Sequence, residues 1–203
     1  MTIYLATSNA GKAADFGALG LPVAPLPDFT SLPPIEETGK TFEANARLKA
    51  VHYSHFTGAC VLADDSGLEV DALEGAPGVY SARFAGRHGD DEANNRLLLE
   101  RLLGIPAARR TARFVCVLVL ARQGEMLAEF RGEAGGRILD AARGARGFGY
   151  DPLFYSPAAG ASFGELEAGR KGLFSHRGHA ARLLLEWIGA QQANLAGTRP
   201  RDP

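Results

Sequence analysis

The chain has 203 residues, of which 46% are hydrophobic and 22% charged, and its formal net charge at pH 7 is −1. This composition is typical of a globular protein and excludes a chain that is disordered throughout. The near balance of charges also excludes a broad basic surface that would hold a nucleic-acid backbone. Any anion that the protein binds must therefore be held by a local site.

Both cysteines, Cys60 and Cys116, lie within apolar runs. Two cysteines are too few for a zinc ribbon or a secreted disulfide scaffold, so we interpret them as core residues. No segment has the pattern of a signal peptide, and no apolar run approaches the roughly 20 residues that span a membrane. We therefore expect a cytoplasmic protein without a membrane partner.

The sequence begins with a β-prone apolar run at residues 2–6, which predicts a short strand. Small polar residues and a glycine then lead into a helix expected over residues 12–19. Several prolines between positions 20 and 38 are incompatible with a helix interior and predict an irregular connection. Residues 41–56 suit the next helix.

A second strand is expected at residues 60–63, and the polar residues 64–67 are predicted to end it abruptly. Residues 68–71 alternate apolar and charged side chains, which is typical of a separate, half-buried strand. A turn rich in glycine and proline follows at residues 74–78.

Asp90 or Asp91 is suited to cap a helix that Gly104 and a nearby proline end. The leucines of this helix that we expect to face a core are Leu98, Leu99, Leu102 and Leu103. Residues 112–121 form the most hydrophobic run and predict a strand, with residues 126–131 as its hairpin partner.

Glycines crowd residues 144–149, which we interpret as a loop, and a last amphipathic helix is expected over residues 179–193. We predict one domain over residues 1–196 and a disordered tail over residues 197–203. Because strands and helices alternate before a later hairpin, the predicted fold is α/β with a mixed β-sheet flanked by helices. Ligands in such folds commonly bind at the carboxyl ends of strands.

Common nucleotide-binding motifs are not satisfied. Residues 164–171 resemble a phosphate-binding loop, but the lysine comes one place late and Gly172 stands where Ser or Thr is required. Residues 7–12, TSNAGK, instead place hydroxyls, an amide, helix-start N–H groups and one ammonium together. These are the components of an oxyanion cradle, although an ordinary helix cap followed by a solvated lysine explains them too.

The adjacent carboxylates of Asp64 and Asp65 follow an apolar strand, where their mutual repulsion favours a hard cation with oxygen ligands. The alternative is a β-turn with two solvated aspartates. Glu36 and Glu37 form a second acidic pair on the proline-rich connection, which by itself is typical of a solvent-facing loop.

Residues 147–152, GFGYDP, place the ring of Phe148 between two glycines. A ring on such a loop can stack on a nucleobase, although it can equally pack into the core. Lys171 and residues 175–177 supply further donors before the last helix, where the alternative is a helix cap with solvated charges.

Together these segments resemble the inosine triphosphate pyrophosphatase family, the pyrophosphatases of non-canonical purine nucleoside triphosphates. The matching stretches keep one order along the chain and are ATSNAGK at 6–12, EETGKTFEANARLKA at 36–50, ADDSGLEVDALEGAPGVYSARFAG at 63–86, ARFVCVLVL at 112–120, GFGYDPLF at 147–154 and SHRGHA at 175–180.

The resemblance implies an elongated α/β fold with two lobes, a nucleotide cleft between the lobes, and a homodimer. It further implies that dITP, ITP and XTP are hydrolysed to the monophosphate and pyrophosphate with Mg²⁺ as cofactor, which cleanses the nucleotide pool. The partner is then a purine nucleoside triphosphate rather than a nucleic acid.

Carried over residue by residue, the resemblance implies that Asp65 is the catalytic base and that Glu37, Asp65 and Asp64 are metal ligands. The substrate-binding residues that it implies are Thr7, Ser8, Asn9, Ala10, Gly11, Lys12, Lys49, Ser66, Phe148, Gly149, Tyr150, Asp151, Lys171, His176 and Arg177.

Two departures from the family pattern concern this site. Ser8 stands where many members carry glycine, and Gly169 with Arg170 replaces an acidic pair before Lys171.

Two other functions stay open: hydrolysis of other modified or canonical nucleoside triphosphates, and non-catalytic nucleotide binding by a regulator. A regulator would keep the cradle and lose the carboxylates, whereas this sequence has both.

Overall fold

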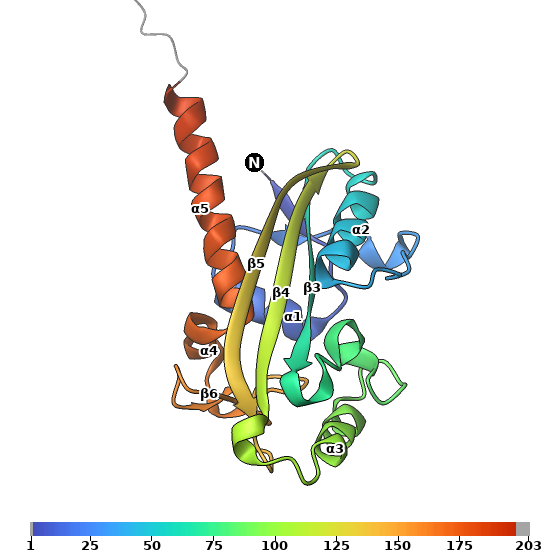
Figure 1. The fold of residues 1–203 in the computed structure, drawn as a ribbon. Helices are drawn as coiled ribbons and strands as arrows, with labels where there is room; N and C mark the ends of the chain where they lie inside the picture. Colours follow the sequence, from blue (N-terminus) through green and yellow to red (C-terminus); the bar gives the residue numbers. More distant parts are fainter. Residues whose placement is uncertain (1, 198–203) are drawn as a thin grey trace, which may run out of the picture.

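The computed structural model describes residues 2–197 and contains a seven-stranded sheet in the order β2-β1-β3-β4-β5-β6-β7 (Figure 1). β1 (Ile3–Leu5) pairs in parallel with β2 (Ala24–Pro25) and with β3 (Cys60–Val70). The antiparallel strands that continue the sheet are β4 (Thr111–Arg122), β5 (Glu125–Ile138), β6 (Phe154–Ser156) and β7 (Ala161–Ser162). The predicted α/β class and mixed sheet are confirmed.

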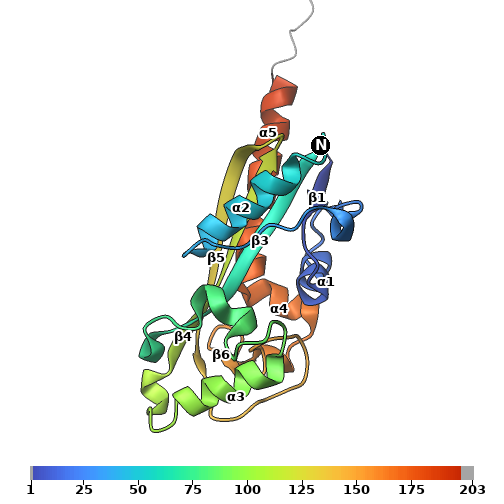
Figure 2. The ribbon, with the colours of Figure 1, turned by 90° about the vertical axis from the view of Figure 1, so that its right-hand side faces the viewer.

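Helices cover both faces of the sheet. They are α1 (Ala10–Ala18), α2 (Phe42–Ser54), α3 (Asp91–Arg101), α4 (Ala168–Phe174) and α5 (His176–Gly197). Figures 1 and 2 show α2 on one face of the long strands and α5 on the other, with α3 near the far end of the β4–β5 hairpin. None of the helices within residues 2–197 has the length and apolar character of a membrane span.

The two faces of the sheet bury alternate residues of β3, because side chains of a strand point to opposite sides in turn. Ala63 lies in one buried cluster with Ala46 of α2. Leu62 lies in another cluster with Phe16 of α1 and Leu184 of α5. Both cysteines are free and buried within these layers, as predicted.

The predicted end of the second strand at residues 64–67 is wrong. β3 continues from Cys60 to Val70 and pairs with β4 along its length, Asp64 opposite Leu118 and Asp65 opposite Val117. The strand continues because each buried carboxylate meets a lysine from a different helix, so the acidic pair does not force a turn.

Smaller differences concern element ends. The first helix begins at Ala10, and the last runs from His176 to Gly197, so residue 197 belongs to a helix and residues 198–203 lie outside the described part of the chain. The inward orientation predicted for Leu103 is also wrong: this side chain is 77% exposed, because α3 ends at Arg101 and the backbone reverses at Gly104 with φ +76°. Leu98 and Leu102 are fully buried.

Candidate active site

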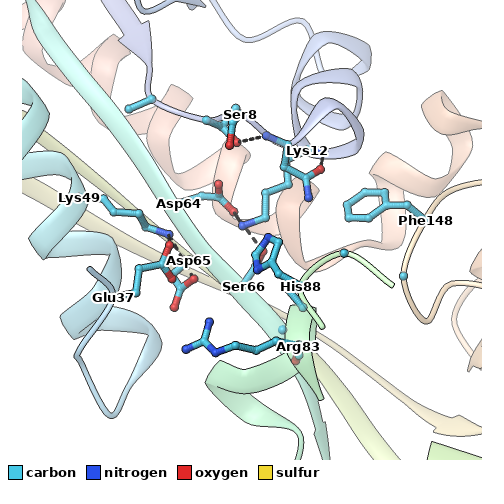
Figure 3. A pocket seen from close by; sticks show the side chains of 18 of the residues that line it. Ser8, Lys12, Glu37, Lys49, Asp64, Asp65, Ser66, Arg83, His88 and Phe148 are labelled. Atoms are coloured by element: carbon cyan, nitrogen blue, oxygen red, sulfur yellow. Dashed lines mark hydrogen bonds and ion pairs between the residues drawn. The ribbon is translucent and has the colours of Figure 1, made fainter. Parts of the chain in front are cut away.

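A cavity of about 520 Å³ lies where β1 ends and β3 continues (Figure 3). β1 pairs with β3 only as far as Leu5 opposite Leu62, and the chain then leaves the sheet to enter α1. This departure leaves residues 64–67 of β3 facing open space on that side. The carboxyl end of β1 therefore forms the crevice that the sequence predicts.

Most of the predicted site residues line this cavity. Those that do are Thr7, Ser8, Asn9, Lys12, Glu37, Lys49, Asp64, Asp65, Ser66, Phe148, Gly149, Tyr150, Asp151, His176 and Arg177. Ala10, Gly11 and Lys171 do not line it. The structure thus brings together residues from α1, α2, β3, α5 and the loop before β6.

Asp64 and Asp65 point to opposite faces of β3, so they do not form one paired site. Asp64 faces α1, where its Oδ2 lies 2.8 Å from Lys12 Nζ and accepts a 3.0 Å hydrogen bond from Ser66 Oγ. Asp65 faces α2, where Lys49 Nζ lies 3.3 Å from its Oδ1. Because the strand edge is open, both carboxylates still border the same cavity.

Burial and charge shift the pKa values of these neighbouring carboxyls in opposite directions. Burial alone would raise the pKa of Asp64, but the nearby cations, chiefly Lys12 and Arg177, outweigh it and lower that pKa to about 2. Burial raises the pKa of Asp65, and the charge of Lys49 does not offset it. A permanently ionised group beside a better proton acceptor is a common arrangement for acid–base chemistry.

Glu37, Lys49 and Asp65 form a chain of charges at one end of the cavity. Lys49 Nζ lies 3.1 Å from Glu37 Oε1 and donates to Asp65 as well. Asn45 ties the two acids in place, since its Nδ2 donates to Asp65 Oδ2 at 3.2 Å and its Oδ1 accepts from Gly39 N on the loop that carries Glu37. Although burial opposes the charge of Lys49, its acidic neighbours raise its pKa, so it stays an ammonium.

The donor set at this end suits Mg²⁺, which prefers carboxylate oxygens and completes its shell with water and phosphate oxygens. Glu37 and Asp65 supply two such carboxylates that already share one cation. Asp64 is directed to Lys12 instead. Within residues 2–197 no three ligating side chains converge, so a metal held here would take its remaining ligands from water or a bound phosphate.

Residues 7–12 form a helix cap, which was the alternative to an oxyanion cradle in the sequence analysis. Asn9 Oδ1 accepts from Lys12 N at 2.9 Å, and Thr7 Oγ1 accepts from Asn9 N at 3.1 Å. The lysine, however, is not solvated, because Lys12 pairs with the buried Asp64. The N–H groups of Ala10 and Gly11 have no acceptor within the described residues, so the cap and an anion cradle coexist.

At the other end of the cavity, Phe148 stands on a loop whose conformation depends on glycine. Gly147 and Gly149 have φ of +74° and +60°, which favour glycine. Lys171 Nζ and the Arg177 guanidinium lie 5.2 and 5.0 Å from the centre of the ring. Figure 3 shows Lys49 and Phe148 at opposite ends of the view, with Lys12 between them.

Lys171 is buried in a cluster of charges instead of projecting into the cavity. Its Nζ lies 2.7 Å from Asp151 Oδ2 and 3.0 Å from Asp15 Oδ2, and only 3% of its side chain is exposed. Arg177 joins the cluster through Asp15 at 3.1 Å and donates to Ser66 Oγ at 2.8 Å. This cluster therefore ties α1, α4 and α5 to the loop that carries Asp151.

His176 lies beside this cluster, stacked on Phe114 with ring centres 4.7 Å apart. Burial, followed by the charges of Arg177 and Lys171, holds the pKa of His176 well below its ordinary value. Its Nδ1 and the Nε of Arg177 are buried without a hydrogen-bond partner within residues 2–197. Buried polar groups without a partner are rare in native proteins.

Among the further residues that line the cavity and were not predicted from the sequence, three carry a titratable or charged side chain of interest here: Arg83, His88 and Asp91. Arg83 ends the 3-10 turn Gly78–Arg83, and no carboxylate within the described residues pairs with it. Figure 3 shows Arg83 on the side of the cavity away from α1, and the ring of His88 near the tip of Lys12 in this view. Arg83 lies within the segment 63–86 that carries the resemblance and His88 lies just after it, whereas Asp91 was noted only as a possible helix cap.

The sheet, with lysines, carboxylates and a helix start gathered at the end of β1, defines an α/β protein with a cavity lined by charged side chains. The comparisons are more specific: the chain belongs to the Ham1 family, whose model matches residues 3–187.

Relatives of known sequence and structure agree with this assignment. The "dITP/XTP pyrophosphatase" of Exiguobacterium sibiricum is 52% identical, over 91% of this chain and 95% of the relative. The protein of the same name from Geobacter sulfurreducens is 48% identical, over 93% and 97%. The Staphylococcus aureus Ham1 protein structure is 39% identical with a TM-score of 0.83, covering 94% of this chain and all of that chain.

Proposed function

We propose that this protein is a dITP/XTP pyrophosphatase, which hydrolyses non-canonical purine nucleoside triphosphates to the monophosphate and pyrophosphate. The observation that carries the proposal is the pairing of Lys49 with Asp65 and of Lys12 with Asp64 along a cavity that also holds an aromatic ring. Relatives that bear this activity in their names are about half identical over nearly the whole chain.

The cavity suits a nucleotide lying along its length. The triphosphate would lie against the start of α1 and the two lysines, and the base would lie near Phe148 and the last helix. The long β3–β4–β5 segment then connects two lobes, with the nucleotide cleft between them. This division rests on Lys49, which lies opposite Phe148 in Figure 3, and on Lys12 between them, whereas Arg177, 5.0 Å from the ring centre, is already paired with Asp15.

Hydrolysis requires a proton acceptor for water and charge neutralisation on the leaving group. Asp65, whose pKa burial raises, would take the proton as the water oxygen bonds to the α-phosphorus. The bond from that phosphorus to the bridging oxygen breaks, and pyrophosphate leaves with the electron pair. Lys12 and Lys49 would neutralise its charge.

Mg²⁺ is the metal that the site suits, held by Glu37 and Asp65 together with phosphate oxygens. When bound, it polarises the phosphoryl oxygens and lowers the charge that the lysines must balance. Without it, the lysines of the cavity are already matched by Glu37, Asp64 and Asp65.

Base selection would rest on donors aimed at the purine 6-oxygen. Hypoxanthine and xanthine present an acceptor there, whereas adenine presents a donor. Arg177 keeps a buried Nε without a partner, and a site that leaves such a donor unpaired against adenine discriminates strongly. His176 is held neutral, so its ring can donate and accept.

A homodimer in a reducing, cytoplasmic setting completes the proposal. Two free, buried cysteines suit such a compartment. Light scattering of the purified protein tests the dimer.

Pyrophosphate release from a panel of nucleoside triphosphates, with and without Mg²⁺, tests the proposed reaction. We expect rapid release from dITP, ITP and XTP only when Mg²⁺ is present. Preferred hydrolysis of a canonical or modified pyrimidine nucleotide would favour the second hydrolase, and tight binding without turnover would favour the regulator.

A further inference from the structure

The loop that carries Phe148 is held by a helix to which no functional role has been given. Gly149 N donates to Asp91 Oδ2 at 2.6 Å, and Asn95 Nδ2 donates to Gly149 O at 2.9 Å. Asp91 and Asn95 lie one turn apart on α3, so they reach the loop from the same face of that helix. Both polar groups of Gly149 are therefore fixed by one helix.

Gly149 is the residue of this loop that most needs such support. Its φ of +60° reverses the chain directly after Phe148, and an added Cβ would meet no atom within 4 Å. Gly149 has no side chain of its own to pack, so these two hydrogen bonds contribute to the order of its backbone. The backbone of Phe148 itself has a further hydrogen bond, since Phe148 N donates to Asp151 Oδ2 at 3.1 Å.

α3 is itself firmly anchored. Leu98 and Leu102 are fully buried, in one cluster with Tyr150. Asn94 adds a second tie, because its Oδ1 accepts from Ala85 N at 2.8 Å, just after the turn that ends at Arg83. One helix thus holds both the loop beside the ring and the segment on the opposite side of the cavity.

We propose that Asp91 and Asn95 are positioning residues for substrate binding: they fix the Gly149 backbone and so place the Phe148 ring for the base. This inference rests on the proposed function, because the ring matters only if a base binds beside it. It deepens that function, since Asp91 and Asn95 act on recognition of the nucleoside and leave binding of the phosphates unchanged.

Asp91→Ala removes the acceptor, and we expect the KM for dITP to rise about 10- to 100-fold. Asn95→Ala should act in the same direction. Asp91→Asn keeps an acceptor oxygen and should recover most of the loss. Glu92→Ala is the matched control, because Glu92 is also an acidic residue of the first turn of α3 but lies in solvent, 3.6 Å from Arg96.

Competitive inhibition by pyrophosphate separates positioning from general damage, because pyrophosphate carries no base. We expect its inhibition constant in Asp91→Ala to stay within about twofold of the wild type. The proposal is overturned if pyrophosphate binding weakens as much as dITP binding, if Asp91→Asn is as impaired as Asp91→Ala, or if the KM of Asp91→Ala is unchanged.

The two hydrogen bonds by which Asp91 and Asn95 hold the Gly149 backbone form a clamp. Amide hydrogen exchange of residues 147–151 in the free protein tests the clamp without any substrate. Exchange should become at least about tenfold faster in Asp91→Ala and stay unchanged in Glu92→Ala. Faster exchange in a protein that releases no pyrophosphate from dITP would refute the proposed function and leave the clamp standing. Unchanged exchange in Asp91→Ala would refute the clamp itself.

Discussion

Gly11 at the start of α1 lies directly against the ring of Phe148: a Cβ added to Gly11 would come within 2.5 Å of Phe148 Cδ1. The first turn of α1 therefore also limits where the aromatic ring can lie. Gly11 does not border the cavity, yet a larger residue at this position would displace the ring, which does border it.

We accordingly expect Gly11→Ala to displace the ring and to lower kcat/KM for dITP by roughly 5- to 150-fold, the range expected for losing one stacked base. Gly17→Ala is the control on the same helix, because an added Cβ there meets nothing within 4 Å. Steady-state kinetics of both variants decide the matter. Equal activity in the two would show that the ring position is irrelevant to catalysis.

Lys12 and Lys171 should differ in what their loss affects. Lys12 borders the cavity, so Lys12→Ala should mainly raise the KM for the triphosphate. Lys171→Ala leaves the buried Asp151 without its cation and Asp15 with Arg177 alone, and should lower the free energy of unfolding by about 3–5 kcal/mol. Urea denaturation measures this loss, and adding Asp151→Asn should restore part of it. A fully stable Lys171→Ala protein would contradict the structural role.

Arg83 should bind substrate even though the resemblance assigns it no role. Its guanidinium borders the cavity and has no carboxylate partner within residues 2–197, so Arg83→Gln should lower kcat/KM for dITP by about 10- to 150-fold. Arg87→Gln makes the same charge change on an exposed neighbour that does not border the cavity. If both variants lose activity equally, the loss reflects the change in net charge and contradicts a direct contact between Arg83 and the substrate.

The buried His176 predicts a pH dependence of stability. Its folded-state pKa is lowered, so below about pH 6.5 the unfolded chain binds a proton that the folded chain does not. Stability from this group is present above pH 6.5 and is lost as the pH falls, by up to about 1.4 kcal/mol per pH unit. Denaturation between pH 7.5 and about 5.5 should give a shallower slope in His176→Gln than in the exposed control His88→Gln. Identical slopes would contradict the assignment.

The sequence predicted the sheet class and most of the cavity because local chemistry fixes them. Asn9 has a side chain suited to cap the helix that follows it. A continuous apolar run such as residues 112–121 is typical of a strand in the middle of a sheet that is covered on both faces. The course of β3 through Asp64 and Asp65 was not predictable, because it depends on lysines that two other helices bring close only in the folded chain.

The burial of Lys171 and the orientation of Arg83 toward the cavity were also not predictable, because they too depend on tertiary packing. A sequence shows that a cation is present, whereas its partners at Asp15 and Asp151 are set by tertiary packing. Arg83 and Arg87 likewise look alike in the sequence, and only the 3-10 turn that ends at Arg83 directs one of them to the cavity.

The central claim is that Asp65 removes the proton of the water that splits dITP into dIMP and pyrophosphate. Single-turnover conversion of dITP by the wild type and by Asp65→Asn, at saturating Mg²⁺ and with both products identified by chromatography, tests it directly. We expect the wild type to form dIMP and pyrophosphate, and Asp65→Asn to form them at least about 100-fold more slowly while still folded. Near-normal turnover by Asp65→Asn, or release of orthophosphate by the wild type, would contradict the claim.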